Sequence, residues 1–181
     1  MMTMTGEKVK LRALEPTDID ALYEWENDCG IWYLSNTLAP VSRFVLEQYL
    51  LSSHQDIYTA KQLRLMIEAS MKDSYVPAGL VDLFDFDPNH LRAGVGIMVA
   101  GKYRRKGYAT EALALLIRFC FDTLHLHQLY CHIPGDNDAS MRLFKRHGFE
   151  ITGRFKQWSR GESGWNDVFF MQLVNDRVVA P

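Results

Sequence analysis

A basic turn with a single glycine has the residue types to bind phosphate: Arg104-Arg105-Lys106-Gly107-Tyr108-Ala109-Thr110. It follows a strand-like segment and leads into a segment with apolar residues at helical spacing. The first N–H groups of a helix have no partner within the helix, and the helix dipole is positive there. Gly107 lets a ligand approach the backbone without meeting a Cβ atom. The turn therefore predicts a diphosphate site, the alternative at this point being a surface turn that only begins a helix.

Other phosphate and metal motifs do not fit the chain. Five residues separate Gly101 from Gly107 where a P-loop has four, and no Gly-Lys-[Ser/Thr] follows. Val99 stands where a dinucleotide fingerprint that began at Gly94 would have its third glycine. The two histidines of His125-Leu126-His127 would point to opposite sides of an extended chain, so we expect no metal site.

Composition limits the class of protein. The chain has 181 residues, of which 48% are hydrophobic, so it can bury a core as a single domain over residues 1–181. The formal net charge of -2 gives no general attraction for nucleic acid or for an anionic membrane, and we expect neither as a partner. No apolar segment is long enough for a signal peptide or a membrane span. We therefore expect a cytoplasmic protein whose three cysteines are reduced.

The periodicity of apolar residues predicts an alternation of strands and helices around the basic turn. We expect helices near residues 17–27, 42–50, 107–124 and 137–147, and strands near residues 8–14, 62–69, 76–86, 93–99, 128–133, 149–158 and 165–173. Tight turns join some strands and helices separate others, which implies both antiparallel and parallel pairing. The predicted class is α/β (α+β), a mixed central β-sheet flanked by helices in the order βααβββαβαββ.

Two segments, spaced along the sequence as in the family, resemble motifs of the GNAT superfamily of N-acetyltransferases. Arg104-x-x-Gly107-x-Ala109, followed by Glu111-Ala112-Leu113, looks like the family's motif A, whose turn binds the pyrophosphate of acetyl-CoA. Asn137-Asp138-Ala139-Ser140, running on to Phe144-Lys145-Arg146-His147-Gly148-Phe149, resembles its second cofactor segment. The GNAT fold has the order of elements predicted above.

The two ends of the chain narrow this resemblance. The opening Val9-Lys10-Leu11-Arg12-Ala13-Leu14 and the closing Trp165-Asn166-Asp167 are similar to the branch that holds spermidine acetyltransferases and ribosomal-protein N-terminal acetyltransferases. The resemblance thus covers nearly the whole chain. It implies transfer of an acetyl group from acetyl-CoA, as cosubstrate, to a primary amine by direct attack in a ternary complex.

The resemblance also implies which residues hold the cofactor. In the family the backbone of the strand before motif A pairs with the pantetheine arm, the motif A turn holds the diphosphate, and the last helix contributes further contacts. The corresponding residues are Met98, Val99, Arg104, Arg105, Lys106, Gly107, Tyr108, Ala109, Thr110, Asn137, Ser140 and Phe144. Asn137 can also serve simply as a helix N-cap.

Phe144 departs from the family pattern, because relatives commonly carry a tyrosine there that protonates the CoA thiolate. A phenylalanine cannot donate a proton. A thiolate with a pKa near 8.5 can leave unassisted at neutral pH, so the enzyme function survives this loss. A water, Tyr33 or Tyr108 could replace the donor, and the alternative is a catalytically weak domain that binds or senses acyl-CoA. The catalytic residues therefore stay unassigned.

The acceptor site is less defined by the sequence. Residues 93–97 hold no carboxylate to deprotonate the amine, so Glu26, Asp82 and Asp85 are the candidates, each of which could instead be a solvated charge. Trp32 and Tyr33 could line the pocket by cation–π contact. Ser35-Asn36-Thr37 stands where polyamine acetyltransferases have acidic residues, which argues against a polyamine and leaves the amine open as a small molecule, a polyamine or a protein N-terminus. Trp158 and Trp165, predicted to be exposed, permit a homodimer.

Overall fold

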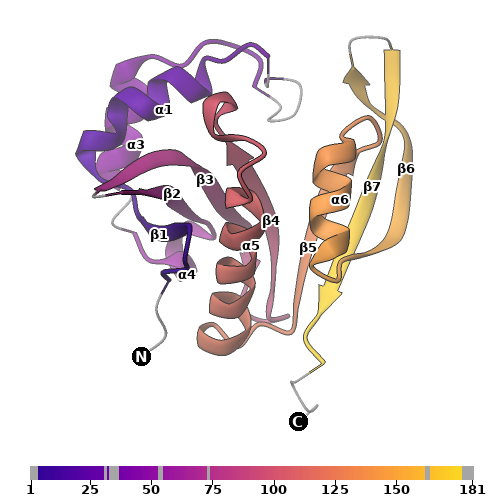
Figure 1. Cartoon of the computed structure of the whole chain (residues 1–181). Coiled ribbons are helices and arrows are strands. Elements are labelled where there is room, and N and C mark those ends of the chain that lie inside the picture. The colour runs from indigo at the N-terminus through magenta and orange to yellow at the C-terminus, as the bar shows by residue number, and fades with distance from the viewer. Residues whose placement is uncertain are drawn as a thin grey trace.

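A seven-stranded sheet organises the computed structural model, which describes residues 4–30, 32, 37–52, 55–72, 74–161 and 164–176. The strands lie in the order β1-β2-β3-β4-β5-β7-β6 (Figure 1). Their bounds are β1 Val9–Ala13, β2 Leu63–Met71, β3 Ser74–Asp87, β4 Arg92–Val99, β5 Gln128–Pro134, β6 Glu150–Gly161 and β7 Gly164–Val174. The final hairpin places β7 between β5 and β6.

The sheet divides between β4 and β5, two strands that pair in parallel. That pairing covers only Arg92 to Gly94 against Gln128 to Tyr130. Beyond Gly94 and Tyr130 the two strands diverge, so that β1 to β4 form one half of the sheet and β5, β7 and β6 the other (Figure 1). We call the region between the diverging strands the wedge.

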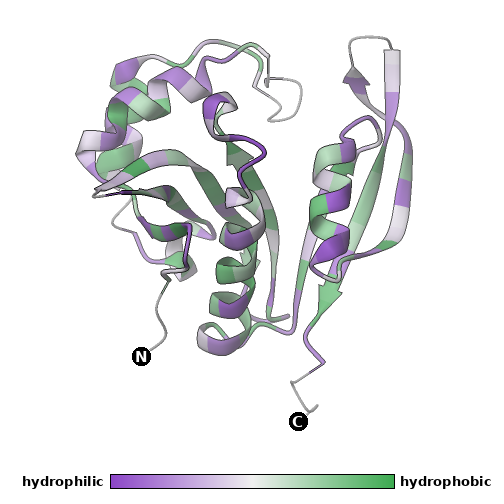
Figure 2. Ribbon diagram, in the orientation of Figure 1, coloured by the Kyte–Doolittle hydropathy of each residue, from purple (hydrophilic) through white to green (hydrophobic). Residues whose placement is uncertain are grey.

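Helices cover both faces of the first half. On one face α1 Ile19–Glu26 and α3 Arg43–Ser52 pack on the sheet through a cluster that includes Leu22 and Leu46. On the other face α5 Tyr108–Arg118 packs on β2 to β4, and α6 Asp138–Arg146 packs on the second half. Figure 2 shows the apolar residues concentrated on the strands and on the sheet side of α5, with polar residues on its outer side.

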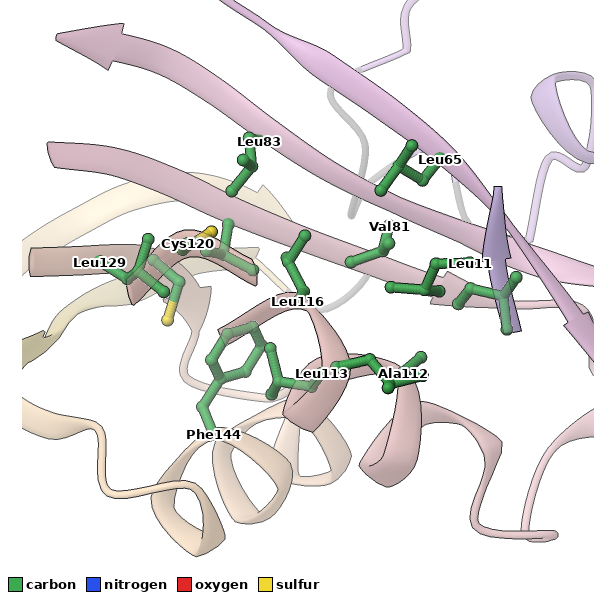
Figure 3. Close-up of a cluster of buried hydrophobic side chains, with 14 of the residues drawn as sticks. Leu11, Leu65, Val81, Leu83, Ala112, Leu113, Leu116, Cys120, Leu129 and Phe144 are labelled. Carbon is green, nitrogen blue, oxygen red and sulfur yellow. The ribbon is translucent and has the colours of Figure 1, made fainter. Parts of the chain in front are cut away.

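The larger core lies between α5 and the sheet (Figure 3). Leu113, Leu116 and Cys120 recur at helical spacing and are fully buried against Val81 and Leu83 of β3. Each fully buried apolar side chain stabilises the fold by about 1.5–3 kcal/mol relative to an exposed one. This packing fixes the position of α5 on the sheet, and with it the position of the first turn of α5. The beginning of α5 is the basic turn.

The predicted order of elements is confirmed, with three local differences. A four-residue helix, α4 Ile57–Ala60, was not predicted because it is too short for periodicity; the Asp56 carboxylate accepts hydrogen bonds from two N–H groups at its start. The helix predicted to continue to residue 124 ends as an α-helix at Arg118 and continues as a π-helical turn, Phe119–Thr123. Short 3-10 turns, Pro16–Asp18 and Gly101–Tyr103, precede α1 and the basic turn. Within the described ranges, no helix has the length and apolar character to cross a bilayer.

Candidate active site

The basic turn forms a loop whose amides are available to a ligand. After β4 and the 3-10 turn, Arg105 has φ 62° and Gly107 has φ 84°, both left-handed, and α5 begins at Tyr108. Glu111 is the first residue of α5 whose N–H reaches a backbone acceptor, the Gly107 carbonyl at 3.1 Å. Among the described residues, none accepts a hydrogen bond from the N–H groups of residues 105–110. This arrangement can bind an anion with several oxygens.

The edge of β4 that faces the wedge offers further backbone groups. Ala100 donates its N–H to the Ala78 carbonyl on β3 at 2.9 Å, and backbone groups alternate between the two edges of an antiparallel strand. The N–H and C=O of Ile97 and Val99 therefore face the wedge, where pairing with β5 has ended. The Val99 carbonyl accepts a hydrogen bond from Arg104 Nε at 3.0 Å.

Met98, which the sequence grouped with Val99, is oriented differently. Its register with Leu80 places its backbone groups toward β3, so its main chain does not face the wedge. Its side chain instead lines a hollow between α1 and the start of the basic turn. The hollow is lined by Glu24, Trp25, Asp28, Met98, Ala100, Gly101, Lys102 and Arg104, and so has an acidic wall on α1 and a basic wall opposite. Trp25 is a core residue with 6% of its surface exposed.

The last helix has the capping geometry expected from its sequence. The Asn137 side-chain oxygen accepts a hydrogen bond from the Ser140 N–H at 3.1 Å, and α6 begins at Asp138. Asn137 is therefore an N-cap, which contributes about 1 kcal/mol to helix stability. Capping uses only its carbonyl oxygen and leaves its amide group for another partner.

Phe144 is part of the core. Its ring is 3% exposed and meets Phe149 edge-on, with ring centroids 5.0 Å apart and planes at 89°. Figure 3 shows it beside Leu113 of α5. The side chain has no proton to donate, and its observed contacts are those of a packing residue.

Two of the three carboxylates proposed for the acceptor site, Glu26 and Asp82, are held by one arginine that the sequence reasoning missed. Arg64 of β2 contacts Asp82 Oδ1 at 2.6 Å and Glu26 Oε1 at 2.8 Å. Burial opposes the charge of Arg64, but the two carboxylates outweigh it and keep its pKa above the ordinary value. The register of the β2–β3 hairpin, in which Arg64 lies opposite Asp82, is the signal that could have found it. Neither carboxylate is free to act as a simple base.

Trp32, predicted to line the acceptor pocket, contacts the end of α1. Its indole Nε1 donates to the Glu26 carbonyl at 2.9 Å, which joins it to the Arg64 group. Tyr33, the other aromatic residue predicted to line the pocket, lies outside the described residues. The structure thus brings Glu26 and Asp82 together at Arg64, with Trp32 bonded to the backbone of Glu26.

A row of aromatic side chains crosses the sheet where β4 and β5 part. The rings of Phe84 and Tyr130 meet edge-on at 5.9 Å, and Gly94 makes room for Phe84, because a Cβ at Gly94 would lie 2.1 Å from that ring. Tyr130 and His132 both contact Phe170 of β7, with centroids 5.5 and 5.1 Å apart. This aromatic row lies at the closed end of the wedge, where Gly94 of β4 still pairs with Tyr130 of β5.

One carboxylate borders the aromatic row. Asp85 lies in a β-bulge of β3 with φ 49°, and its Oδ2 accepts a hydrogen bond from the Tyr130 hydroxyl at 3.4 Å. Burial lowers the pKa of His132 even though Asp85 acts in the opposite direction, so its imidazole is neutral at pH 7. Asp87 and Arg92 line the same hollow but pair with each other at 3.3 Å, whereas Asp85 forms no ion pair among the described residues. Ring faces beside an unpaired carboxylate suit an organic cation.

The loop that can bind an anion, the diverging strands and the order of elements agree with one family model. The model is described as an acetyltransferase (GNAT) domain and matches residues 8–150. This chain belongs to the GNAT acetyltransferases. It is accordingly an acetyl-CoA-dependent N-acetyltransferase, and the sensing domain considered above is not favoured.

Relatives of this GNAT chain act on amines. It is 28% identical, over 152 residues, to spermidine N(1)-acetyltransferase of Escherichia coli strain K12, covering 82% of this chain and 76% of that protein. It is 24% identical over 175 residues to spermidine N(1)-acetyltransferase of Vibrio cholerae, covering 95% and 96%. The crystal structure of the Vibrio cholerae spermidine N-acetyltransferase with CoA and spermine has the same fold, with a TM-score of 0.80, 24% identity and coverage of 93% and 96%.

Proposed function

We propose that the wedge binds acetyl-CoA and that the acceptor is a small aliphatic amine with a second positive charge, of the polyamine class. The single observation that carries the acceptor class is the aromatic row bordered by Asp85. Ring faces and a carboxylate are the groups that bind ammonium ions in proteins. The names of the relatives support the same class and outweigh the argument against a polyamine drawn from residues 35–37.

The cofactor is held mainly by backbone groups. The amides of Arg105, Lys106, Gly107, Tyr108, Ala109 and Thr110 bind the diphosphate, and the Arg104 and Arg105 side chains supply positive charge. The wedge-facing groups of Ile97 and Val99 pair with the pantetheine arm as an added strand would. The Arg104 guanidinium must then share or leave the Val99 carbonyl. Support comes from the absence of protein acceptors for the loop amides within the described residues.

The remaining predicted cofactor residues have secondary roles. Met98 contributes its side chain, and Asn137 and Ser140 contact the cofactor from the first turn of α6, with Asn137 using its amide group. Phe144 supports α6 from the core and contacts the cofactor only through its ring edge. The register of Met98, the capping bond of Asn137 and the burial of Phe144 support these roles.

The chemistry is a direct attack in a ternary complex. The neutral amine approaches from the side of the aromatic row and forms a C–N bond with the thioester carbon, while a wedge-facing N–H of β4 stabilises the developing oxyanion. The C–S bond then breaks, and the thiolate leaves without a protein donor from position 144. The proton of the amine passes to water, because Glu26 and Asp82 are paired with Arg64.

A panel of acceptors tests this function. Purified protein with acetyl-CoA is offered spermidine, spermine, aliphatic monoamines, amino acids, aminoglycosides and N-terminal peptides, and free thiol is measured. We expect turnover with the polyamines at a KM well below that of the monoamines. Turnover with a peptide alone would reject the acceptor class, and CoA binding without any thiol release would reject the transferase. Phe144→Tyr raises kcat if protonation of the thiolate limits the rate.

We also propose a cytoplasmic location and self-association. The cytoplasm is where acetyl-CoA and reduced thiols occur together, and the three cysteines are free. Trp158 and Trp165 are each 65% exposed on the β6–β7 hairpin, which is a surface for a second copy of the chain. A dodecamer is described for the Vibrio cholerae spermidine N-acetyltransferase. Light scattering of the wild type and of a Trp158→Ser variant tests this surface, with a smaller assembly expected for the variant.

A further inference from the structure

Lys8 is distant in the sequence from residues 105–110, whose amides we propose to bind the diphosphate and which we call the phosphate loop. Its side chain nevertheless brings an ammonium group to this loop. Its Nζ lies 3.2 Å from the position that a Cβ on Gly107 would occupy, and its Cδ lies 3.9 Å from the same point. Gly107 is the N-cap of α5 and the centre of the loop amides described above. The sequence analysis expected motif A to supply all the positive charge at this site. The segment before β1 adds a further cation to it.

Glu111 fixes the backbone from which this side chain extends. Its carboxylate accepts the N–H groups of Glu7 at 2.7 Å, of Lys8 at 2.7 Å and of Val9 at 2.9 Å. Glu111 lies in the first turn of α5, directly after the loop. On the other side, the Lys8 carbonyl accepts a hydrogen bond from the Ser70 N–H at 2.8 Å. The Lys8 backbone is thus held in place, and its flexible side chain extends from there to Gly107.

The charge of Lys8 has no protein partner among the described residues. Lys10, two positions along, pairs with Glu68 at 2.8 Å, whereas Lys8 forms no ion pair there. The nearby Glu111 carboxylate is already occupied by three N–H groups. The Lys8 ammonium also lies beside Gly107, at the positive end of α5. Positive groups that converge on one point bind an anion.

We infer that Lys8 is a phosphate-binding residue of the acetyl-CoA site and that Glu111 is its positioning residue. The contact at Gly107 places the ammonium at the diphosphate, since the loop amides that surround Gly107 bind those oxygens. The 3′-phosphate of the cofactor offers the same oxyanion chemistry and is the other group that Lys8 can reach. The inference concerns the cofactor and does not depend on which amine is acetylated.

The test is calorimetric binding of CoA and of dephospho-CoA, which lacks the 3′-phosphate, to Lys8→Met. The matched control is Lys156→Met, which removes the same charge from β6, at the opposite edge of the sheet from β1. We expect the Kd of both ligands to rise about tenfold for Lys8→Met and to stay within about twofold for the control. The dependence of the Kd on salt should also weaken, and Lys8→Arg should restore most of the affinity.

Comparison of CoA with dephospho-CoA shows whether Lys8 contacts the diphosphate or the 3′-phosphate. An equal loss for CoA and dephospho-CoA supports contact with the diphosphate, and a loss for CoA alone supports contact with the 3′-phosphate. An unchanged Kd for both ligands overturns the inference. The thermal unfolding temperature of the ligand-free variant should not fall below that of the wild type, because Lys8 has no ion pair to lose among the described residues. A fall accompanied by an unchanged salt dependence also overturns the inference.

The positioning role of Glu111 has its own test. Glu111→Gln keeps one acceptor oxygen and loses the charge, so the segment before β1 is held less firmly. We expect this change to weaken CoA binding in the wild-type background and to have little further effect in the Lys8→Met background. Equal losses in both backgrounds would mean that Glu111 acts only on the fold, which overturns its assignment.

Discussion

The left-handed conformation of Gly107 makes a quantitative prediction about Gly107→Ala. At φ 84° an L-residue with a Cβ is strained by about 1–2 kcal/mol. The added Cβ would meet only the flexible end of Lys8, with Nζ at 3.2 Å, which can move aside and adds little. The free energy of unfolding should therefore fall by about 1–2 kcal/mol, and Gly107→Asn should lose less because asparagine tolerates this conformation.

Gly101 is a matched control six residues earlier in the same connection. A Cβ there meets no atom within 4 Å, and its φ is not left-handed. Gly101→Ala should therefore be neutral, or more stable by up to about 1 kcal/mol through the unfolded state. Urea unfolding of the wild type, Gly107→Ala and Gly101→Ala, repeated with saturating acetyl-CoA, measures both the strain and the effect of ligand binding on stability. Ligand stabilisation should decrease for Gly107→Ala only, because the loop amides shift with the backbone.

Two results would refute this reasoning. If Gly107→Ala unfolds at the same urea concentration as the wild type, the residue is not in the left-handed region. If Gly101→Ala loses as much stability as Gly107→Ala, the loss arises from the helix start in general and not from one φ angle.

Three further predictions concern other parts of the molecule. Arg64→Met leaves the two carboxylates that it holds unpaired, so we expect the KM for the amine to change by at least fivefold and the KM for acetyl-CoA to change by less than twofold, which steady-state kinetics can separate. Burial opposes ionisation of Asp18, but its bonds to Arg12 outweigh this and lower its pKa. The stability that the ionised carboxylate contributes is complete above about pH 4 and is lost as pH falls through the folded pKa. Asp18→Asn should therefore make the free energy of urea unfolding depend less on pH in the acid range. Cys29 is exposed and the other two cysteines are buried, so a thiol reagent should label one site in the native protein and three after unfolding.

Local chemistry determined much of the cofactor site. The basic turn, its glycine and the apolar period of the following helix are all within about 20 residues, and N-terminal helix amides bind anions regardless of the rest of the fold. Asn137 was predicted as an N-cap for the same reason, since capping involves residues three positions apart. The order of strands and helices was also predictable, because periodicity is a local property.

Long-range contacts determined what the sequence analysis missed. Nothing near Lys8 in the sequence indicates that its ammonium lies at Gly107, because Glu111 brings the two together across about 100 residues. Arg64 was missed because it joins Glu26 to Asp82 only when the β2–β3 register and the position of α1 are both known. The orientation of the Met98 backbone likewise depends on the register between β3 and β4, in which Met98 lies opposite Leu80.

The sequence by itself determined the family, the class of cofactor and the order of the elements, since each depends on residues close together in the chain. Only the tertiary structure decided which backbone groups face the wedge, which carboxylates are already paired and which distant cation lies beside the phosphate loop. The physical reason is that charge pairing and strand edges depend on distances through space, and the packing of α5 on the sheet sets those distances.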